Sequence, residues 1–207
     1  MTHVKVCGIT NLEDALAALE AGADMLGFNF YARSPRYVSP PEALRIVERL
    51  PAGVSCVGVF VNESAPAEVE RIAREAGLGA VQLHGDEPPE YCRSLGGLTT
   101  IKALRVGADF DVESAAAYDT DAVLLDAYVP GARGGTGHTF DWALATLTRE
   151  RVPRLFLAGG LNPDNAAAAV AAVRPYAVDV CSGVETSPGR KSPELMRRFV
   201  KAVVSSQ

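Results

Sequence analysis

Short apolar runs recur at fairly even intervals along the 207-residue chain, and each is followed by an amphipathic stretch. This alternation of strand-like and helix-like segments predicts a parallel sheet covered by helices. Eight repeats in a chain of this length favour a compact α/β fold, the (β/α)8 or TIM barrel. The strands are expected at His3–Cys7, Met25–Phe30, Ser55–Val61, Ala80–Leu83, Thr100–Leu104, Ala122–Asp126, Arg154–Ala158 and Ala177–Cys181.

An open, doubly wound sheet is the alternative architecture. It usually has fewer strands, and no G-x-G-x-x-G motif follows the first apolar run. No linker, charge block or low-complexity segment divides the chain. We therefore predict a single domain over residues 1–207.

Polar residues in front of the amphipathic stretches predict where the helices begin. Two capping boxes of the form S/T-x-x-E are present, and other starts combine a cap with a following proline. The caps are expected at Thr10, Ser39, Ser64, Asp86, Asn162 and Ser192.

Composition excludes several classes of protein. The formal net charge is −5, and no basic run offers a surface for nucleic acid. The longest apolar stretches, such as Ala166–Val173, are far shorter than the ~20 residues that cross a bilayer. The four cysteines are dispersed without a C-x-x-C pair, and three scattered histidines provide no ligand cluster, so no metal site is expected. With no secretory signal, free thiols and a cytoplasmic location are the default.

Two side chains at strand ends are candidates for chemistry. Cys7 ends the first predicted strand, and Asp126 ends the sixth, so in a barrel both project into the mouth. Lys5 shares the strand face of Cys7. From position alone, Cys7 is either a catalytic thiol or a small buried side chain, and Asp126 is either catalytic or an anchor for the following loop.

Glycine-containing loops follow the last two predicted strands. Gly159 and Gly160 follow the seventh strand, whereas Ser182 and Gly183 follow the eighth. In barrels these two loops often bind a phosphate through backbone N–H groups, although tight turns alone also favour glycine. The run Gly134–Gly137 is not a P-loop, because no G-K-[ST] follows.

Other polar residues lie near the same end of the predicted barrel. Arg36 lies in the long connection Tyr31–Val38, where its guanidinium can bind a carboxylate. A second long connection, Ala127–Thr139, follows the sixth strand. Asp179 either contacts a ligand or pairs with Lys5, and His84 either lines the mouth or caps a turn.

Seven short motifs occur in order from the first predicted strand to the last: Val4–Thr10, Gly27–Phe30, Ser34–Tyr37, Gln82–Gly85, Gly134–Gly137, Leu157–Leu161 and Ser182–Glu185. As an ordered set they resemble the phosphoribosylanthranilate isomerase family over essentially the whole chain. The resemblance implies the Amadori rearrangement of N-(5-phosphoribosyl)anthranilate to 1-(2-carboxyphenylamino)-1-deoxyribulose 5-phosphate, without metal or redox cofactor, in tryptophan biosynthesis.

The resemblance also implies roles for individual residues. Cys7 matches the family's general base, Asp126 its general acid, and Arg36 the arginine that holds the anthranilate carboxylate. Independently of the resemblance, Asp179 is expected from its position to contact substrate, and the cation of Lys5 is expected to favour the Cys7 thiolate. Cys181 departs from the family, which often has serine there, and we expect this difference to affect local packing only.

Three alternatives remain at this point. The fold also suits other phosphosugar barrels, such as a metal-dependent epimerase or a synthase with a catalytic lysine. Lys5 and Lys102 lie inside strands rather than at their ends, which disfavours the synthase. A catalytically silent phosphate-binding barrel is the third alternative. A homodimer is possible, but nothing in the sequence requires it.

Overall fold

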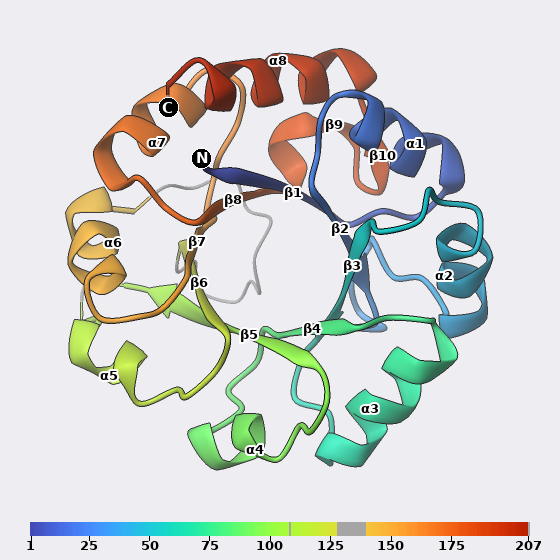
Figure 1. Cartoon of the computed structure of the whole chain (residues 1–207), viewed down its shortest axis with the longest axis horizontal. Coiled ribbons are helices and arrows are strands. Elements are labelled where there is room, and N and C mark those ends of the chain that lie inside the picture. The colour runs from blue at the N-terminus through green and yellow to red at the C-terminus, as the bar shows by residue number, and fades with distance from the viewer. Residues whose placement is uncertain (108, 128–139, 207) are drawn as a thin grey trace.

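The computed structural model describes residues 1–107, 109–127 and 140–206. Its eight parallel strands form a closed barrel, in which each strand pairs with the next and β8 pairs with β1 (Figure 1). The predicted (β/α)8 barrel is confirmed, and the predicted strands differ from the observed ones only at their ends. The strands are β1 (His3–Cys7), β2 (Met25–Asn29), β3 (Ser55–Phe60), β4 (Ala80–Leu83), β5 (Thr99–Val106), β6 (Ala122–Ala127), β7 (Leu155–Leu157) and β8 (Ala177–Val180).

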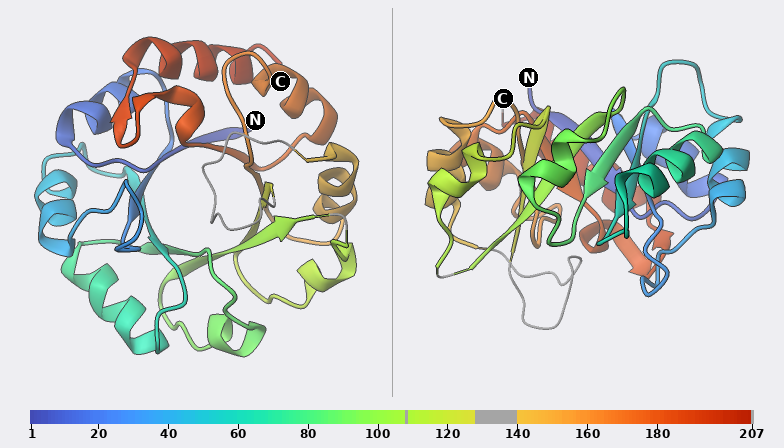
Figure 2. Two further views of the ribbon diagram at one scale, coloured as in Figure 1. Left: turned by 180° about the vertical axis from the view of Figure 1, so that it is seen from behind. Right: turned by 90° about the horizontal axis from the view of Figure 1, so that it is seen from below.

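Helices surround the barrel as an outer ring (Figure 1). They are α1 (Leu12–Glu20), α2 (Pro40–Val47), α3 (Pro66–Glu75), α4 (Pro89–Arg93), α5 (Val112–Ala116), α6 (Trp142–Arg149), α7 (Ala166–Val173) and α8 (Pro193–Val204). Between β8 and α8 lie a short 3-10 helix, η1 (Ser182–Val184), and a small hairpin, β9 (Glu185–Ser187) and β10 (Arg190–Lys191). In the right panel of Figure 2 this orange-red hairpin lies at the end of the barrel opposite to the two termini. In the described part of the chain, no helix has the length and apolar character to span a membrane.

Two of the predicted helix caps are confirmed. The Ser39 capping box is present, with the Ser39 N–H donating to the Glu42 carboxylate at 2.9 Å. The Ser192 hydroxyl accepts the N–H of Leu195 at 3.3 Å, at the start of α8. Both helices carry proline in the first turn, where its missing N–H is not needed.

The other four caps are wrong, because neighbouring residues take their place. Asn11, not Thr10, caps α1, and the Thr10 hydroxyl donates instead to the Gly189 carbonyl at 2.6 Å. Helices α3 and α4 begin at their prolines, after Ala65 and Pro88, rather than at Ser64 and Asp86. Asn162 accepts the N–H of Asp164 in a turn that precedes α7.

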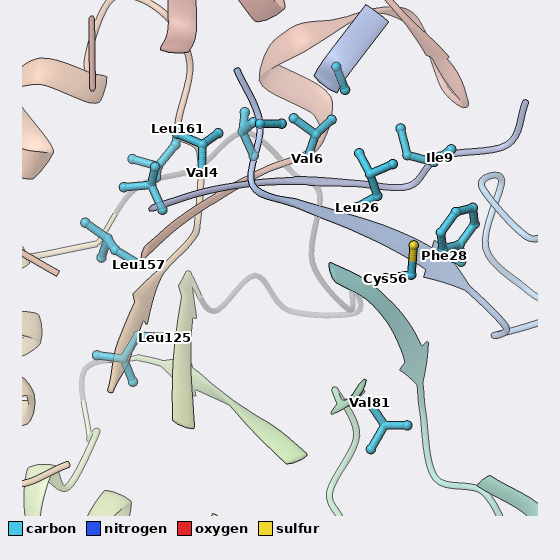
Figure 3. Close-up of a cluster of buried hydrophobic side chains, with 14 of the residues drawn as sticks. Val4, Val6, Ile9, Leu26, Phe28, Cys56, Val81, Leu125, Leu157 and Leu161 are labelled. Carbon is cyan, nitrogen blue, oxygen red and sulfur yellow. The ribbon is translucent and has the colours of Figure 1, made fainter. Parts of the chain in front are cut away.

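The alternation of side chains along β1 positions the site. Val4 and Val6 pack in the apolar layer between strands and helices (Figure 3). Because successive side chains point to opposite faces, Lys5 and Cys7 point into the barrel. A second apolar cluster fills the barrel interior below them: Met25, Val57, Ala80, Ile101, Ala103, Ala122, Leu124, Phe156, Ala158 and Ala177.

Candidate active site

A cavity of about 380 Å³ opens at the carboxyl ends of the barrel strands. This is the end at which barrel enzymes build their sites. Seven of the eight site residues predicted from the sequence line it: Cys7, Arg36, Asp126, Gly159, Gly160, Asp179 and Ser182. The sequence prediction did not include other polar lining residues, among them Asn29, Gln82 and Cys181. Among the described residues, no cluster of three or more His, Cys, Asp or Glu side chains forms a metal site.

A buried ion pair lies beside Cys7. Lys5 and Asp179 are opposite each other on β1 and β8, and Lys5 Nζ donates to Asp179 Oδ1 at 2.8 Å. Burial alone lowers the pKa of Lys5, but attraction to Asp179 and to Cys7 outweighs it and holds the pKa above its usual value. Burial raises the pKa of Asp179 to about 7, although Lys5 opposes this shift. The ammonium group of Lys5 therefore stays charged next to the Cys7 sulfur.

The Cys7 thiol is acidified by its neighbours. Cys7 is 8% exposed, and a hydrogen bond from Cys181 lowers its pKa well below the usual thiol value. Lys5 and Lys191 lower this pKa further, whereas burial opposes them. The same hydrogen bond and burial raise the pKa of Cys181. An influence of Cys181 on the pKa of Cys7 goes beyond the effect on local packing that we expected from the sequence.

Asp126 is held by hydrogen bonds to both of its carboxylate oxygens. Oδ1 accepts the backbone N–H of Ala127 at 2.9 Å. Oδ2 lies 3.2 Å from Nε2 of His84, and Nδ1 of the same ring lies 2.8 Å from Nε2 of Gln82. Of the two roles left open for His84, it therefore lines the mouth of the barrel. Gln82 and His84 lie two residues apart on one strand face, a spacing from which their contact could have been predicted.

Arg36 is fixed by a carboxylate of the protein itself. Its Nε and Nη2 donate to the two oxygens of Glu185 at 2.9 and 2.6 Å. These bonds raise the pKa of Arg36 above its usual value, against the effect of burial. Glu185 also pairs with the buried Lys191 at 2.8 Å. Sequence reasoning missed this cluster because Arg36 and Glu185 are 149 residues apart.

The glycine loops after β7 and β8 lie against each other. Gly159 and Gly160 have φ values of +81° and +63°, which other residues rarely adopt. A Cβ atom on Gly183 would collide with the carbonyl of Leu161. Gly183 itself does not line the cavity, whereas its neighbour Ser182 does. Glycine thus allows the left-handed backbone of the first loop and the close approach of the second, and Gly159 and Gly160 also expose backbone to the cavity.

Two predicted features lie elsewhere. Lys102 is buried outside the cavity and pairs with Glu87 at 2.6 Å. The Gly134–Gly137 run lies outside the described residues, as does most of the long connection after β6.

Known proteins resemble this chain along its whole length. The sequence model of the family described as N-(5′-phosphoribosyl)anthranilate (PRA) isomerase matches residues 4–202. The N-(5′-phosphoribosyl)anthranilate isomerase of Trichlorobacter lovleyi is 52% identical over 201 residues, which cover 97% of each chain.

Solved structures of such isomerases have the same fold. The enzyme from Thermotoga maritima superposes with a TM-score of 0.92 at 48% identity, over 99% of this chain and 100% of that one. Another structure was solved in complex with reduced 1-(o-carboxyphenylamino)-1-deoxyribulose 5-phosphate; it has a TM-score of 0.89 and 46% identity over 99% of this chain and 100% of that one.

Proposed function

Because this chain belongs to the N-(5′-phosphoribosyl)anthranilate isomerase family, we propose that Cys7 and Asp126 are the base and the acid of its reaction. The protein is an isomerase of tryptophan biosynthesis. It converts N-(5-phosphoribosyl)anthranilate to 1-(2-carboxyphenylamino)-1-deoxyribulose 5-phosphate. The observation that carries the proposal is that the Cys7 thiol and the Asp126 carboxyl group line one cavity at the carboxyl ends of the strands.

The reaction begins with two proton transfers. Asp126 donates a proton to the ring oxygen of the ribose, the bond from that oxygen to C1′ breaks, and a protonated Schiff base forms at the anthranilate nitrogen. The Cys7 thiolate then removes the proton on C2′; the electron pair of that C–H bond forms the C1′=C2′ double bond of the enolamine, and the C=N pair returns to nitrogen. Loss of the O2′ proton and addition of a proton to C1′ then give the ketone. The reaction requires a protonated carboxylic acid and an ionised thiol at the same pH. The two groups must therefore lie in different environments. The lowered pKa of Cys7 supports its half of this division.

The remaining lining residues suit the two ends of the substrate. Within the described residues Glu185 holds Nε and Nη2 of Arg36, so the Nη1 group remains for the anthranilate carboxylate. We propose that Asp179 accepts a hydrogen bond from a ribose hydroxyl, which its place in the lining of the cavity supports. For the phosphate we propose the loops after β7 and β8, through the following four residues: Gly159, Gly160, Ser182 and Gly183. The positive φ angles of the first two and the cavity position of Ser182 support this.

We also propose that two copies of the chain associate. A solved structure describes the isomerase from Thermotoga maritima as dimeric, and that chain has 46% identity to this one. Leu16 on α1 and Tyr37 in the loop after β2 are large apolar side chains that are 41% and 43% exposed. Sedimentation velocity tests the proposal, and a single monomeric species at micromolar concentration would contradict it.

A cytoplasmic location and a single folding unit complete the proposal. The four cysteines are free thiols, and the reaction needs one of them reduced, which favours a reducing compartment. The first and last strands of the barrel pair with each other, so neither half closes without the other. Urea unfolding is expected as one transition with coincident near-UV and far-UV signals.

Two substitutions test the catalytic pair. Asp126→Asn and Cys7→Ala are each expected to lower kcat by roughly 10²- to 10⁴-fold while the circular dichroism spectrum is unchanged. The assay follows the decay of phosphoribosylanthranilate fluorescence with purified protein and no added metal. Turnover near the unsubstituted rate in either variant would remove that residue from the mechanism.

A further inference from the structure

Gln82 is a polar side chain in the middle of a buried strand. It is 1% exposed, and its neighbours on β4 are apolar. Its Oε1 atom is buried without a hydrogen-bond partner in the part of the chain that the structure describes. Burying an unpaired amide oxygen is unfavourable, and an apolar residue of similar size would avoid it. Packing alone therefore does not explain a glutamine here, and its one bonded atom indicates what it does.

That bonded atom is Nε2, which lies 2.8 Å from Nδ1 of His84. An amide N–H can only donate, so Nδ1 must accept and carries no proton. In a neutral imidazole the proton is then on Nε2, which lies 3.2 Å from Oδ2 of Asp126 and donates to it. The reversed amide would put the proton on Nδ1 and turn an imidazole lone pair toward the carboxylate.

We propose that Gln82 is a positioning residue that fixes the tautomer of His84, so that the His84 Nε2–H stabilises the carboxylate of Asp126 after proton donation. The inference rests on the role proposed for Asp126 as the acid. Negative charge develops on this carboxylate while the ribose ring opens. The N–H groups of His84 and Ala127 already face its two oxygens, so they stabilise the charge without rearrangement.

The tautomer is measurable directly, because the chain has only three histidines. We expect the ¹⁵N shifts of His84 in the unsubstituted enzyme to report the Nε2–H tautomer, with assignment by comparison with His84→Gln. In Gln82→Met, which has similar length and no amide, the shifts should move toward a mixture of tautomers. His3 is the internal control, because its Nδ1 faces Asp24 at 3.2 Å and its signal should not change.

Kinetics should show the same dependence. Gln82→Met is expected to lower kcat about tenfold or more with little change in KM, because the lost stabilisation exists only after proton transfer begins. His84→Gln keeps an amide donor near the Nε2 position but has no tautomers. Adding Gln82→Met to His84→Gln should therefore leave kcat unchanged. Thr100→Val, which removes another buried polar group of the barrel, is the matched control with normal kcat.

Three results would overturn the inference. One is a predominant Nδ1–H tautomer of His84 in the unsubstituted enzyme. This measurement does not depend on the folding of any variant. The second is a changed tautomer in Gln82→Met with normal kcat. The third is an equal loss from Gln82→Met in the presence and absence of His84→Gln. A fully active Asp126→Asn would instead contradict the proposed acid, and the tautomer measurement separates that failure from this one.

Discussion

Two buried lysine–carboxylate pairs in the same barrel have different surroundings. Lys5 and Asp179 are 2.8 Å apart on β1 and β8, and Lys102 on β5 is 2.6 Å from Glu87. The two lysines are 0% and 1% exposed. The two ion pairs are therefore alike in chemistry and burial. They differ in the number of their other hydrogen-bond partners and in the groups that face them.

The pair of Lys102 and Glu87 is closed on itself. The Glu87 carboxylate also accepts backbone N–H groups of Asn62 and Gly85 at 2.7 and 2.9 Å, and Lys102 donates to the Gly85 carbonyl at 2.9 Å. Neither member lines the active-site cavity. All of these bonds join the loops after β3 and β4 to the barrel, which is a structural role.

The pair of Lys5 and Asp179 is open toward the cavity. Asp179 lines it, and the charge of Lys5 acts on the neighbouring Cys7 thiol. A buried ion pair therefore belongs to the site where its charge reaches a reactive group, and to the scaffold where backbone groups satisfy it.

The largest expected effect comes from removing the two lysines one at a time. Lys5→Met should lower kcat/KM roughly 100-fold at neutral pH, because the loss of a neighbouring cation raises the pKa of the Cys7 thiol and depletes the thiolate. Lys102→Met should leave kcat/KM within about twofold of normal. Both should lower the free energy of unfolding by about 3–5 kcal/mol, since each leaves a buried carboxylate unpaired.

Steady-state assays and urea unfolding on the same preparations separate the two effects. The assays are made at a temperature at which circular dichroism shows both variants to be folded. Equal losses of kcat/KM in the two variants would show that the open and closed pairs do not differ in function.

The ion pair of Arg36 is intermediate between those of Lys5 and Lys102. Its guanidinium is hydrogen-bonded to Glu185 and also lines the cavity. Arg36→Ala should raise KM about tenfold or more and change kcat less, because a carboxylate contact present in substrate and transition state alike is lost. Glu185→Gln keeps the guanidinium and should have a smaller effect on KM. A normal KM in Arg36→Ala would make this ion pair structural, like that of Lys102.

Cys181→Ala refines the account of what ionises Cys7. The hydrogen bond from Cys181 holds the pKa of Cys7 below its usual value, so the thiolate is present above that lowered pKa and is lost as the pH falls through it. Without the bond the pKa rises, and the acid limb of the kcat/KM profile should move to higher pH by about one unit. Cys181→Ser retains a donor and should shift the limb less. An unmoved limb in Cys181→Ala would leave Lys5 and Lys191 as the cause of the low pKa.

The sequence predicts the fold better than the bonds within the site. Strand periodicity and strand ends were sufficient to bring Cys7, Asp126 and Asp179 to one cavity, because parallel strands place their carboxyl ends together. Local capping rules were wrong at Thr10, whose hydroxyl bonds to a carbonyl 179 residues away. A rule based on neighbouring residues cannot predict such a partner.

The same limit explains why Glu185 and Lys191 were missed. Arg36, in the long connection after the second strand, was predicted to bind a carboxylate. That this carboxylate belongs to Glu185 of the protein itself depends on how β9 and β10 fold beside the loop after β2. The influence of Cys181 on the pKa of Cys7 could not be predicted for a related reason. The neighbour of Cys181 is set by the pairing of β1 with β8, at opposite ends of the sequence.

The smallest effect is expected when both charges of the Lys102–Glu87 pair are removed together. Lys102→Met leaves Glu87 charged and unpaired, whereas Lys102→Met combined with Glu87→Gln removes both charges and keeps an amide oxygen for the N–H groups of Asn62 and Gly85. The double variant should regain most of the lost free energy of unfolding and lie within about 1–2 kcal/mol of the unsubstituted protein. Urea unfolding measures the coupling, with kcat/KM expected to be normal throughout. If the double variant is as unstable as Lys102→Met, the lysine stabilises the fold through contacts other than its charge, such as the Tyr118 ring 5.7 Å from its Nζ.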